Sequence, residues 1–413
     1  MSRYCISDHC RWVKGDTGSA IYDLKKGIVY PFDHEGTALI EQMLHGYDPS
    51  ETSVAFVSDL IERHLLNDHD FPIAEKRILP SLRYVWLELT NICNCRCIHC
   101  YGAFGIPDNS KSKEKLTLED WKRILDRIAS LGGDSIQFIG GEPLMFPGFM
   151  DLLRYANSLS FRRIDIFTNA FFLTESVADL IADVGASVRV SLYGYDESSH
   201  DAITQHSGSF KRLDHSLDLL KERNIPVSIA VVLMRENQDN IQQIKDYVEK
   251  KGFMYRGFDT VRKVNHSIQN SHTVTDPSLL SERMIKKPKF QTSPYLFSLC
   301  RQWNSCWYGK FAVTASGDII PCIFARDLIC GNIHINSFES IREKLIDYWS
   351  ITKDKVNECS VCEFRYACDD CRPLSLGEGK GLLGKYPRCL YDPLSCQWQT
   401  MSTNGSWISA DHE

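Results

Sequence analysis

The chain has 413 residues, of which 43% are hydrophobic and 24% charged, a composition typical of a folded protein with two or three domains. Its net charge is −6, so the surface as a whole gives no electrostatic reason to expect nucleic-acid binding. No apolar run approaches the roughly 20 residues that span a bilayer, and the polar N-terminus lacks a signal-peptide core. We therefore expect a cytoplasmic protein with no membrane partner.

Residues 1–75 are predicted to form a small module of strands followed by helices. The segments "CRWVK", "SAIYDL" and "GIVYPF" are rich in β-forming residues and are separated by glycine-containing turns. Helical patterns follow over 35–45 and 53–64. These elements indicate a winged-helix-like fold, and the plainer alternative is an extension that packs on the main domain.

Residues 84–265 alternate between strand and helix patterns. The predicted strands are 84–89, 135–139, 163–168, 187–192, 227–233 and 254–260, with amphipathic helices such as "LEDWKRILDRIAS" between them. Six such units predict an α/β domain with a parallel sheet, either open or curved into part of a barrel. In both architectures ligands bind at the C-terminal ends of the strands.

The remainder of the chain divides into a polar linker, 266–299, and a cysteine-rich region, 300–400. The latter contains short strand patterns at "KFAVTA" and "GDIIPCI" and one amphipathic helix at "SFESIREKLIDYW". Of the 16 cysteines, four lie between 93 and 100 and most of the others lie in this region. Clustered cysteines in a reducing compartment indicate metal binding rather than disulfides.

The stretch "LTNICNCRCIHCYG", 89–102, follows the first strand of the α/β domain. A zinc knuckle that uses His99 and a redox CxxC are both compatible with four such close cysteines. The spacing Cys93-x3-Cys97-x2-Cys100, followed by Tyr101, resembles the CxxxCxxC signature of the radical S-adenosylmethionine (AdoMet) superfamily, radical SAM. The resemblance implies that these three thiolates hold a [4Fe–4S] cluster whose fourth iron binds AdoMet. It leaves Cys95 without a ligand role.

Three further segments resemble AdoMet-binding motifs of the same superfamily and follow later strands. They are "GGEP" after the second strand, "TNA" after the third, where the family usually has TNG, and the serine of "VSLYG" at the end of the fourth. Tyr193 replaces an aspartate that is common in the family. The resemblance implies an AdoMet site made by Gly140, Gly141, Glu142, Pro143, Thr168, Asn169 and Ser191.

The C-terminal cysteines resemble a SPASM domain, which follows many radical SAM cores. The resemblance implies two auxiliary [4Fe–4S] clusters, and hence three in all. The first would use Cys300, Cys306, Cys322 and Cys371, and the second Cys359, Cys362, Cys368 and Cys389. A zinc site fits "CSVC" and "CDDC" taken alone. Cys330 and Cys396, like Cys95, are interpreted as free thiols.

Residues 1–75 resemble the PqqD-like peptide-recognition element of maturases of ribosomally made peptides (RiPPs). The resemblances together imply an enzyme that generates a 5′-deoxyadenosyl radical and removes hydrogen from a precursor peptide held by its leader segment. We expect an oxidative cross-link (thioether, C–C or C–O), with an electron donor of flavodoxin or ferredoxin type as the other partner. The alternatives are a peptide epimerase, a sulfatase-activating-type side-chain oxidase and a non-enzymatic zinc-binding scaffold. No catalytic side chain is assigned.

Overall fold

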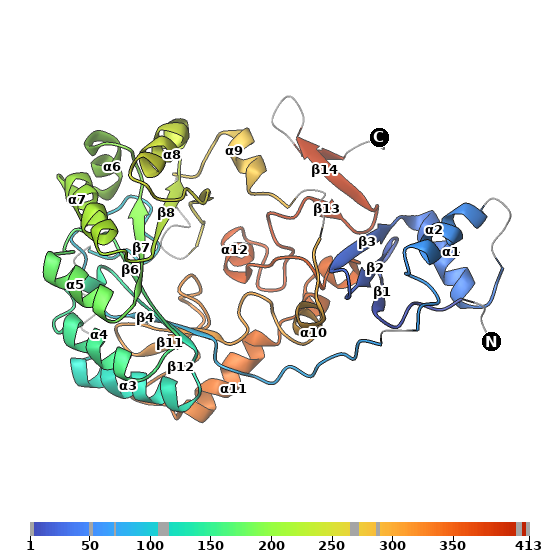
Figure 1. The fold of residues 1–413 in the computed structure, drawn as a ribbon, viewed down its shortest axis with the longest axis horizontal. Coiled ribbons are helices and arrows are strands. Elements are labelled where there is room, and N and C mark those ends of the chain that lie inside the picture. The colour runs from blue at the N-terminus through green and yellow to red at the C-terminus, as the bar shows by residue number, and fades with distance from the viewer. Residues whose placement is uncertain are drawn as a thin grey trace. The chain divides into compact units, whose positions relative to one another are not determined.

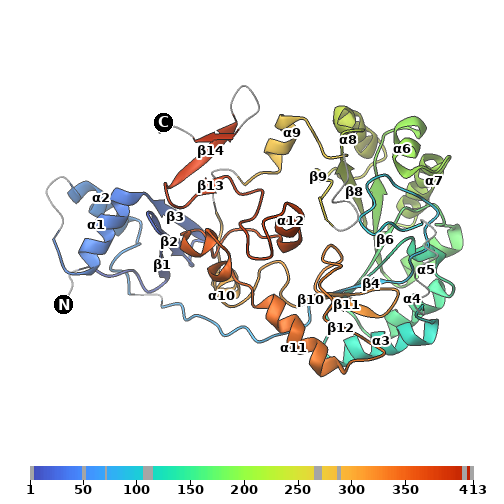
Figure 2. The ribbon, with the colours of Figure 1, turned by 180° about the vertical axis from the view of Figure 1, so that it is seen from behind.

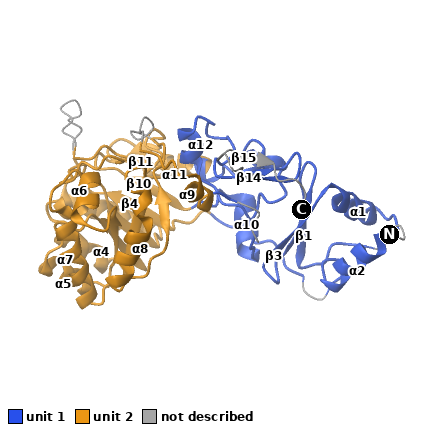
Figure 3. Ribbon diagram, turned by 90° about the horizontal axis from the view of Figure 1, so that it is seen from above, with its two compact units in different colours: residues 1–79, 284–308, 348–413 blue, residues 80–283, 309–347 orange. Residues whose placement is uncertain are grey.

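The computed structural model describes residues 4–48, 53–69, 72–105, 115–264, 272–285, 290–401 and 407–409. The chain forms two compact units, coloured separately in Figure 3. One consists of residues 80–283 and 309–347, and the other of residues 1–79, 284–308 and 348–413. Both units are therefore built from segments that are distant in sequence.

The larger unit contains a nine-stranded sheet in the order β12-β11-β10-β4-β5-β6-β7-β8-β9. Six of these strands run parallel in chain order, as the sequence predicts (Figures 1 and 2). They are β4 (Tyr84–Glu88), β5 (Ser135–Ile139), β6 (Arg163–Thr168), β7 (Ser187–Leu192), β8 (Val227–Leu233) and β9 (Phe258–Thr260). The last is shorter than its predicted range because Gly257 adopts a positive φ of 84° and interrupts the extended chain.

Helices connect the parallel strands and lie along one side of the sheet in Figures 1 and 2. They are α3 (Leu118–Ser130), α4 (Phe149–Ser158), α5 (Glu175–Asp183), α6 (Glu197–Thr204), α7 (Ser209–Glu222) and α8 (Ile241–Lys250). Helix α3 shows why they form, since Thr117 and Asp120 make a capping box at its start. Its buried residues, Trp121, Ile124, Leu125 and Ile128, recur at helical spacing and face the sheet.

Three strands from the cysteine-rich region extend the same sheet. β10 (Lys310–Val313) pairs parallel with β4, and β11 (Asp318–Ile320) and β12 (Gly331–Asn332) follow it antiparallel. The sequence predicts strands near 310 and 318 but does not show their partner, because the pairing joins segments more than two hundred residues apart. Helix α11 (Phe338–Trp349) follows them, as predicted.

The smaller unit contains an antiparallel meander of β1 (Cys10–Lys14), β2 (Ser19–Asp23) and β3 (Ile28–Phe32). Helices α1 (His34–Leu44) and α2 (Val54–Glu62) pack on one face around Ile21, Ile40 and Leu60. The strands and helices predicted for 1–75 are thus present, while the winged-helix assignment stays a prediction.

The other face of this meander packs against later segments of the same unit, through Tyr22, Phe297, Phe364 and Tyr366. These segments include α10 (Pro294–Gln302), β13 (Tyr391–Asp392) and β14 (Gln397–Met401). The same unit also contains α12 (Arg372–Gly377) and β15 (Trp407–Ser409).

The polar segment 266–299, predicted to be a linker, contains a short helix, α9 (Pro277–Glu282), and most of α10 in its described part. Helix α9 begins after Asp276, whose side chain caps it, with Pro277 at its first position. Residues 265–271 and 286–289 lie outside the described residues. Among the described helices, none is long and apolar enough to cross a membrane.

Candidate active site

The cysteine loop, residues 89–105, begins at the C-terminal end of β4. Backbone hydrogen bonds fix it at both sides: Leu89 N–H donates to the Ile139 carbonyl at 2.9 Å, and Arg96 N–H to the Thr204 carbonyl at 2.9 Å. Near its end the Gly105 N–H donates to the Asn91 carbonyl at 3.3 Å. The loop is therefore held between β5 and the end of α6, where a parallel sheet places its ligand sites.

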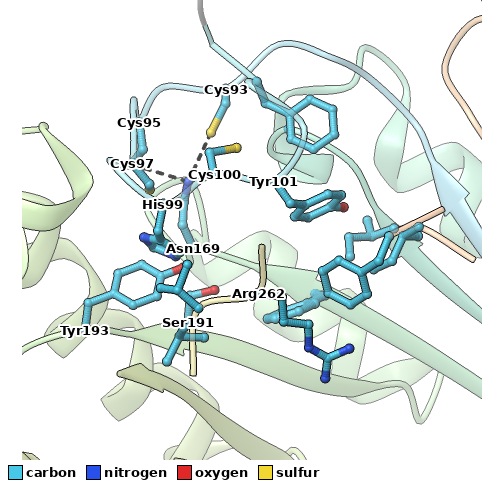
Figure 4. Close-up of a pocket in the computed structure, with 18 of the residues that line it drawn as sticks. Cys93, Cys95, Cys97, His99, Cys100, Tyr101, Asn169, Ser191, Tyr193 and Arg262 are labelled. Atoms are coloured by element: carbon cyan, nitrogen blue, oxygen red, sulfur yellow. Dashed lines mark hydrogen bonds between the residues drawn. The ribbon is translucent and has the colours of Figure 1, made fainter. Parts of the chain in front are cut away.

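A cavity of about 200 Å³ lies beside this loop, at the C-terminal ends of the parallel strands (Figure 4). It is lined by most of the residues that the sequence predicts, which come from four successive strand ends. They are Cys93, Cys97, Cys100, Gly140, Gly141, Thr168, Asn169 and Ser191. Cys95, for which the sequence predicts no ligand role, also lines this cavity.

Two glycines allow the loop after β5 to lie directly against the cysteine loop. Gly140 adopts a φ of 140°, and a Cβ there would lie 2.6 Å from the Thr90 carbonyl oxygen. A Cβ on Gly141 would lie 2.2 Å from the carbonyl oxygen of Ile92. The Gly141 N–H also donates to the Thr90 carbonyl at 2.7 Å. The glycines of "GGEP" are required here by close backbone approach.

We predict that Gly141→Ala displaces the cysteine loop and lowers the iron content of the reconstituted protein. The added methyl would meet backbone atoms, which move only together with the loop that carries Cys93. Gly36→Ala is the matched control, since its Cβ would meet nothing closer than 3.3 Å. Iron assays on the two variants, prepared in parallel, test this; equal iron contents would contradict it.

Asn169 connects the "TNA" loop to the cysteines. Its Nδ2 lies 3.8 Å from the Sγ of Cys93 and 3.6 Å from the Sγ of Cys95, and it donates to the side-chain oxygen of Asn94 at 2.9 Å. Amide donors directed at sulfur orient metal-binding thiolates and tune the metal they hold. The predicted AdoMet residue Asn169 therefore also supports the cysteine loop.

Glu142 is fully buried, and its carboxylate binds the chain itself. Its oxygens accept from the Thr168 hydroxyl at 2.6 Å, from the Asn169 N–H at 2.8 Å and from the Leu144 N–H at 3.0 Å. Burial raises the pKa of this carboxyl to about 7, although the three hydrogen bonds oppose the shift. Glu142 joins the second and third strand ends, and Pro143 begins the short helix after it. Neither is among the residues that line the cavity.

The cavity wall also contains His99, which the sequence offered only as a zinc ligand, and residues that sequence reasoning missed, among them Arg262 and Phe324. Burial lowers the pKa of His99 to about 4, and its ring stacks edge-on against Tyr193 with centroids 4.6 Å apart. The Arg262 guanidinium lies 4.6 Å from the ring centroid of Phe324 and forms an ion pair with Asp259. Arg262 follows β9, so the rule that strand ends carry sites could have identified it.

The C-terminal cysteines are distributed over both units. Cys322 belongs to the larger unit, and the other seven predicted auxiliary ligands belong to the smaller one. Burial raises the pKa of Cys368 to about 12, and the neighbouring thiols of Cys389 and Cys359 add to that shift. Burial and the Glu363 carboxylate raise the pKa of Cys362, and Cys368 and Cys359 add to that shift. The four cysteines of the second predicted set, Cys359, Cys362, Cys368 and Cys389, all belong to the smaller unit.

Comparison with known proteins identifies this architecture. Residues 87–248, which span the cysteine loop and most of the parallel sheet, match the family described as the radical SAM superfamily. The Fe-coproporphyrin III synthase of Methanosarcina barkeri is 31% identical over 331 residues, 69% of this chain and 81% of the relative. The chain belongs to the radical SAM superfamily.

Two further similarities are to a maturation protein and to a protein whose structure contains a precursor peptide. The sporulation killing factor maturation protein SkfB of Bacillus subtilis is 31% identical over 177 residues, which is 42% of this chain and 42% of SkfB. The crystal structure of Streptococcus suis SuiB bound to precursor peptide SuiA has a similar fold, with a TM-score of 0.55 and 15% identity. That similarity covers 93% of this chain and 98% of SuiB.

Membership of the radical SAM superfamily indicates an enzyme and implies a [4Fe–4S] cluster and AdoMet. The residues fit these groups. Cys93, Cys97 and Cys100 supply soft thiolates to one cavity, which suits iron–sulfur chemistry. The glycine backbone of "GGEP" and the polar strand ends at Thr168 and Ser191 line the same cavity, next to the cysteines.

Proposed function

We propose that this radical SAM enzyme modifies a ribosomally made precursor peptide, which it binds by a leader segment, and that it forms an oxidative cross-link in that peptide. The observation that carries the proposal is the extent of the fold shared with SuiB, which covers 93% of this chain. Because so little of this chain is unmatched, most of the N-terminal module, residues 1–75, belongs to the fold that the two proteins share. SuiB was crystallised with a precursor peptide.

The edge of β3 offers a place for the leader segment. The meander has the order β1-β2-β3, so β3 is an edge strand. Among the described residues, its outer side forms one isolated bridge, between Ile28 and Gln291. The rest of that edge presents backbone groups to which an extended peptide adds as a strand, a common mode of peptide recognition. Pro31 lacks an N–H and therefore contributes no donor to such pairing.

The chain's own residues position the reaction. When bound, the cluster and AdoMet supply a 5′-deoxyadenosyl radical, the species that removes hydrogen from carbon. Asn169 and the "GGEP" backbone hold the cysteine loop in place, and the apolar wall of Phe324 and Tyr193 limits the access of water. Arg262 and Asp259, which pair with each other on the same wall, offer a guanidinium and a carboxylate to polar groups of a substrate.

We further propose that the C-terminal cysteines hold two auxiliary [4Fe–4S] clusters, with the ligand sets predicted from the sequence. The second set is supported by Lys353, which is 6% exposed. Its ammonium group forms no hydrogen bond with the described residues. Despite burial, the pKa of Lys353 is raised by Cys368, Asp370 and Cys359. A buried cation near Cys359 and Cys368 would offset part of the negative charge of their thiolates. Such clusters would accept the electron that an oxidative cross-link releases.

A second candidate function is modification of a tetrapyrrole, favoured by the 31% identity to Fe-coproporphyrin III synthase. That match covers 69% of this chain, whereas the fold shared with SuiB covers 93%. A leader-binding module has no evident use in a tetrapyrrole enzyme, so the larger coverage favours the peptide.

Anaerobic co-expression with candidate precursor peptides, followed by mass spectrometry, tests the proposal. A loss of two hydrogens that requires the leader segment is the expected result for a cross-link. An unchanged mass with deuterium incorporation in heavy water would instead indicate epimerisation, and conversion of an added iron porphyrin with no change in any peptide would indicate the second candidate. Purified enzyme with reduced flavodoxin or ferredoxin would then identify the electron donor.

A further inference from the structure

A cluster of metal-binding side chains lies in the N-terminal module, outside the site described above. His9 immediately precedes β1, Cys10 is the first residue of β1, and Asp23 is the last residue of β2. In the antiparallel register Cys10 lies directly opposite Asp23, which places their side chains on the same face of the sheet. The Nε2 of His9 lies 3.8 Å from Oδ1 of Asp23. One ligand atom from each of the three residues lies within 4.8 Å of the others.

The three side chains are almost completely buried and incompletely satisfied. His9 is 1% exposed, Cys10 2% and Asp23 0%. In the described structure neither ring nitrogen of His9 has a hydrogen-bond partner, and neither does Oδ2 of Asp23. A buried polar atom without a partner is destabilising. One ring nitrogen of His9 and Oδ2 of Asp23 can share a single missing partner, which these unsatisfied atoms therefore indicate.

We propose that His9, Cys10 and Asp23 bind a zinc ion. Imidazole nitrogen, thiolate and carboxylate are the donors that zinc takes in proteins. With metal–ligand distances of about 2.0–2.3 Å, a tetrahedral ion holds its ligand atoms about 3.3–3.6 Å apart. The 3.8 Å between His9 and Asp23 is close to that separation. Calcium and magnesium take oxygen ligands, so a thiol and an imidazole argue against both.

The surrounding charges are compatible with a cation at this position. Oδ1 of Asp23 accepts the backbone N–H groups of Lys25 and Lys26 at 3.0 and 2.8 Å, which fixes the carboxylate. The ammonium of Lys26 lies 3.7 Å from Oδ2 but is 41% exposed, so it can turn toward solvent. An ion pair of His9 with Asp23 alone is the competing interpretation. At 3.8 Å such a pair forms no hydrogen bond, and it leaves the buried Cys10 thiol without a role.

A zinc ion here would attach the segment that precedes β1 to the end of the central strand. Since metal binding contributes directly to the stability of small modules, the ion would stabilise the meander. This role is structural and does not depend on the proposed peptide substrate.

Zinc content of the full-length protein tests the inference. After anaerobic purification and dialysis against a zinc-containing buffer, His9→Gln and Asp23→Asn should each contain about one zinc ion fewer per chain than the unchanged protein. Cys5→Ser and His69→Gln are matched controls from the same module and should keep it. Circular dichroism and iron content, equal in all five proteins, show that folding is intact.

X-ray absorption at the zinc edge gives a second measurement that needs no variant and is blind to iron. The inference expects nitrogen or oxygen neighbours together with about one sulfur for this ion. A purely sulfur shell would place the zinc at the C-terminal cysteines and overturn the inference. Zinc contents that are the same in the variants and in the unchanged protein, or no bound zinc in any of them, would also overturn it.

Discussion

Cys97→Ala should abolish AdoMet cleavage and remove about four iron atoms per chain, the content of one [4Fe–4S] cluster. Changes in residues that only support a metal ligand already cost about 10–100-fold in metal affinity or activity. Loss of a ligand should therefore reduce 5′-deoxyadenosine formation by more than about 100-fold. Iron assays, the electron paramagnetic resonance of the reduced protein and chromatography of 5′-deoxyadenosine measure these effects.

Cys95→Ala is the control, and it is a stringent control because Cys95 lies beside the predicted ligands. Cys95 is 2% exposed and lines the same cavity as Cys97. Its Sγ lies 3.4 Å from the side-chain nitrogen of Asn94 and 3.6 Å from that of Asn169. Because the superfamily signature uses the other three cysteines, we expect this variant to keep its cluster and to cleave AdoMet. Loss of about four iron atoms from Cys95→Ala, with none lost from Cys97→Ala, would contradict the assignment.

The sequence was sufficient to predict the parallel strands and which segments meet at their ends, because both depend on local patterns. Apolar runs of five to seven residues correspond to β4 to β8, and each predicted AdoMet segment lies at or just after the C-terminal end of one of them. Strand ends of a parallel sheet lie at one edge, so chain order alone brings Cys93, Gly141, Asn169 and Ser191 together.

Features that depend on long-range geometry could not be predicted in this way. The pairing of β10 with β4 and the contact of Arg326 with Glu88 join distant segments that share no pattern. The sequence also assigns Glu142 to AdoMet, whereas its carboxylate accepts three hydrogen bonds from the chain. Finally, the cluster at Cys10 and Asp23 depends on the register of a hairpin, which a turn of mixed composition does not fix.

Arg326→Met should lower the free energy of unfolding of the larger unit by about 3–5 kcal/mol, the usual cost of leaving one partner of a buried ion pair alone. Glu88, the last residue of β4, is 0% exposed. Nη1 of Arg326 donates to both of its oxygens, at 2.7 and 2.9 Å. Burial raises the pKa of Glu88, and the guanidinium opposes that shift. Urea denaturation followed by circular dichroism measures the loss.

Two further variants separate the cost of leaving the Glu88 charge unpaired from the loss of packing contacts made by Arg326. Arg127→Met breaks a similar pair with Glu339 in the same unit, but those side chains are 48% and 72% exposed, so the loss should stay below about 1 kcal/mol. The double variant Glu88→Gln/Arg326→Met removes the buried charge together with its partner and should recover much of the stability. A double variant no more stable than Arg326→Met would show that the arginine acts by packing against Phe104, whose ring centroid lies 5.4 Å from the guanidinium. In either case the loop that carries Arg326 is attached to the strand from which the cysteine loop begins, so iron retention should fall together with stability.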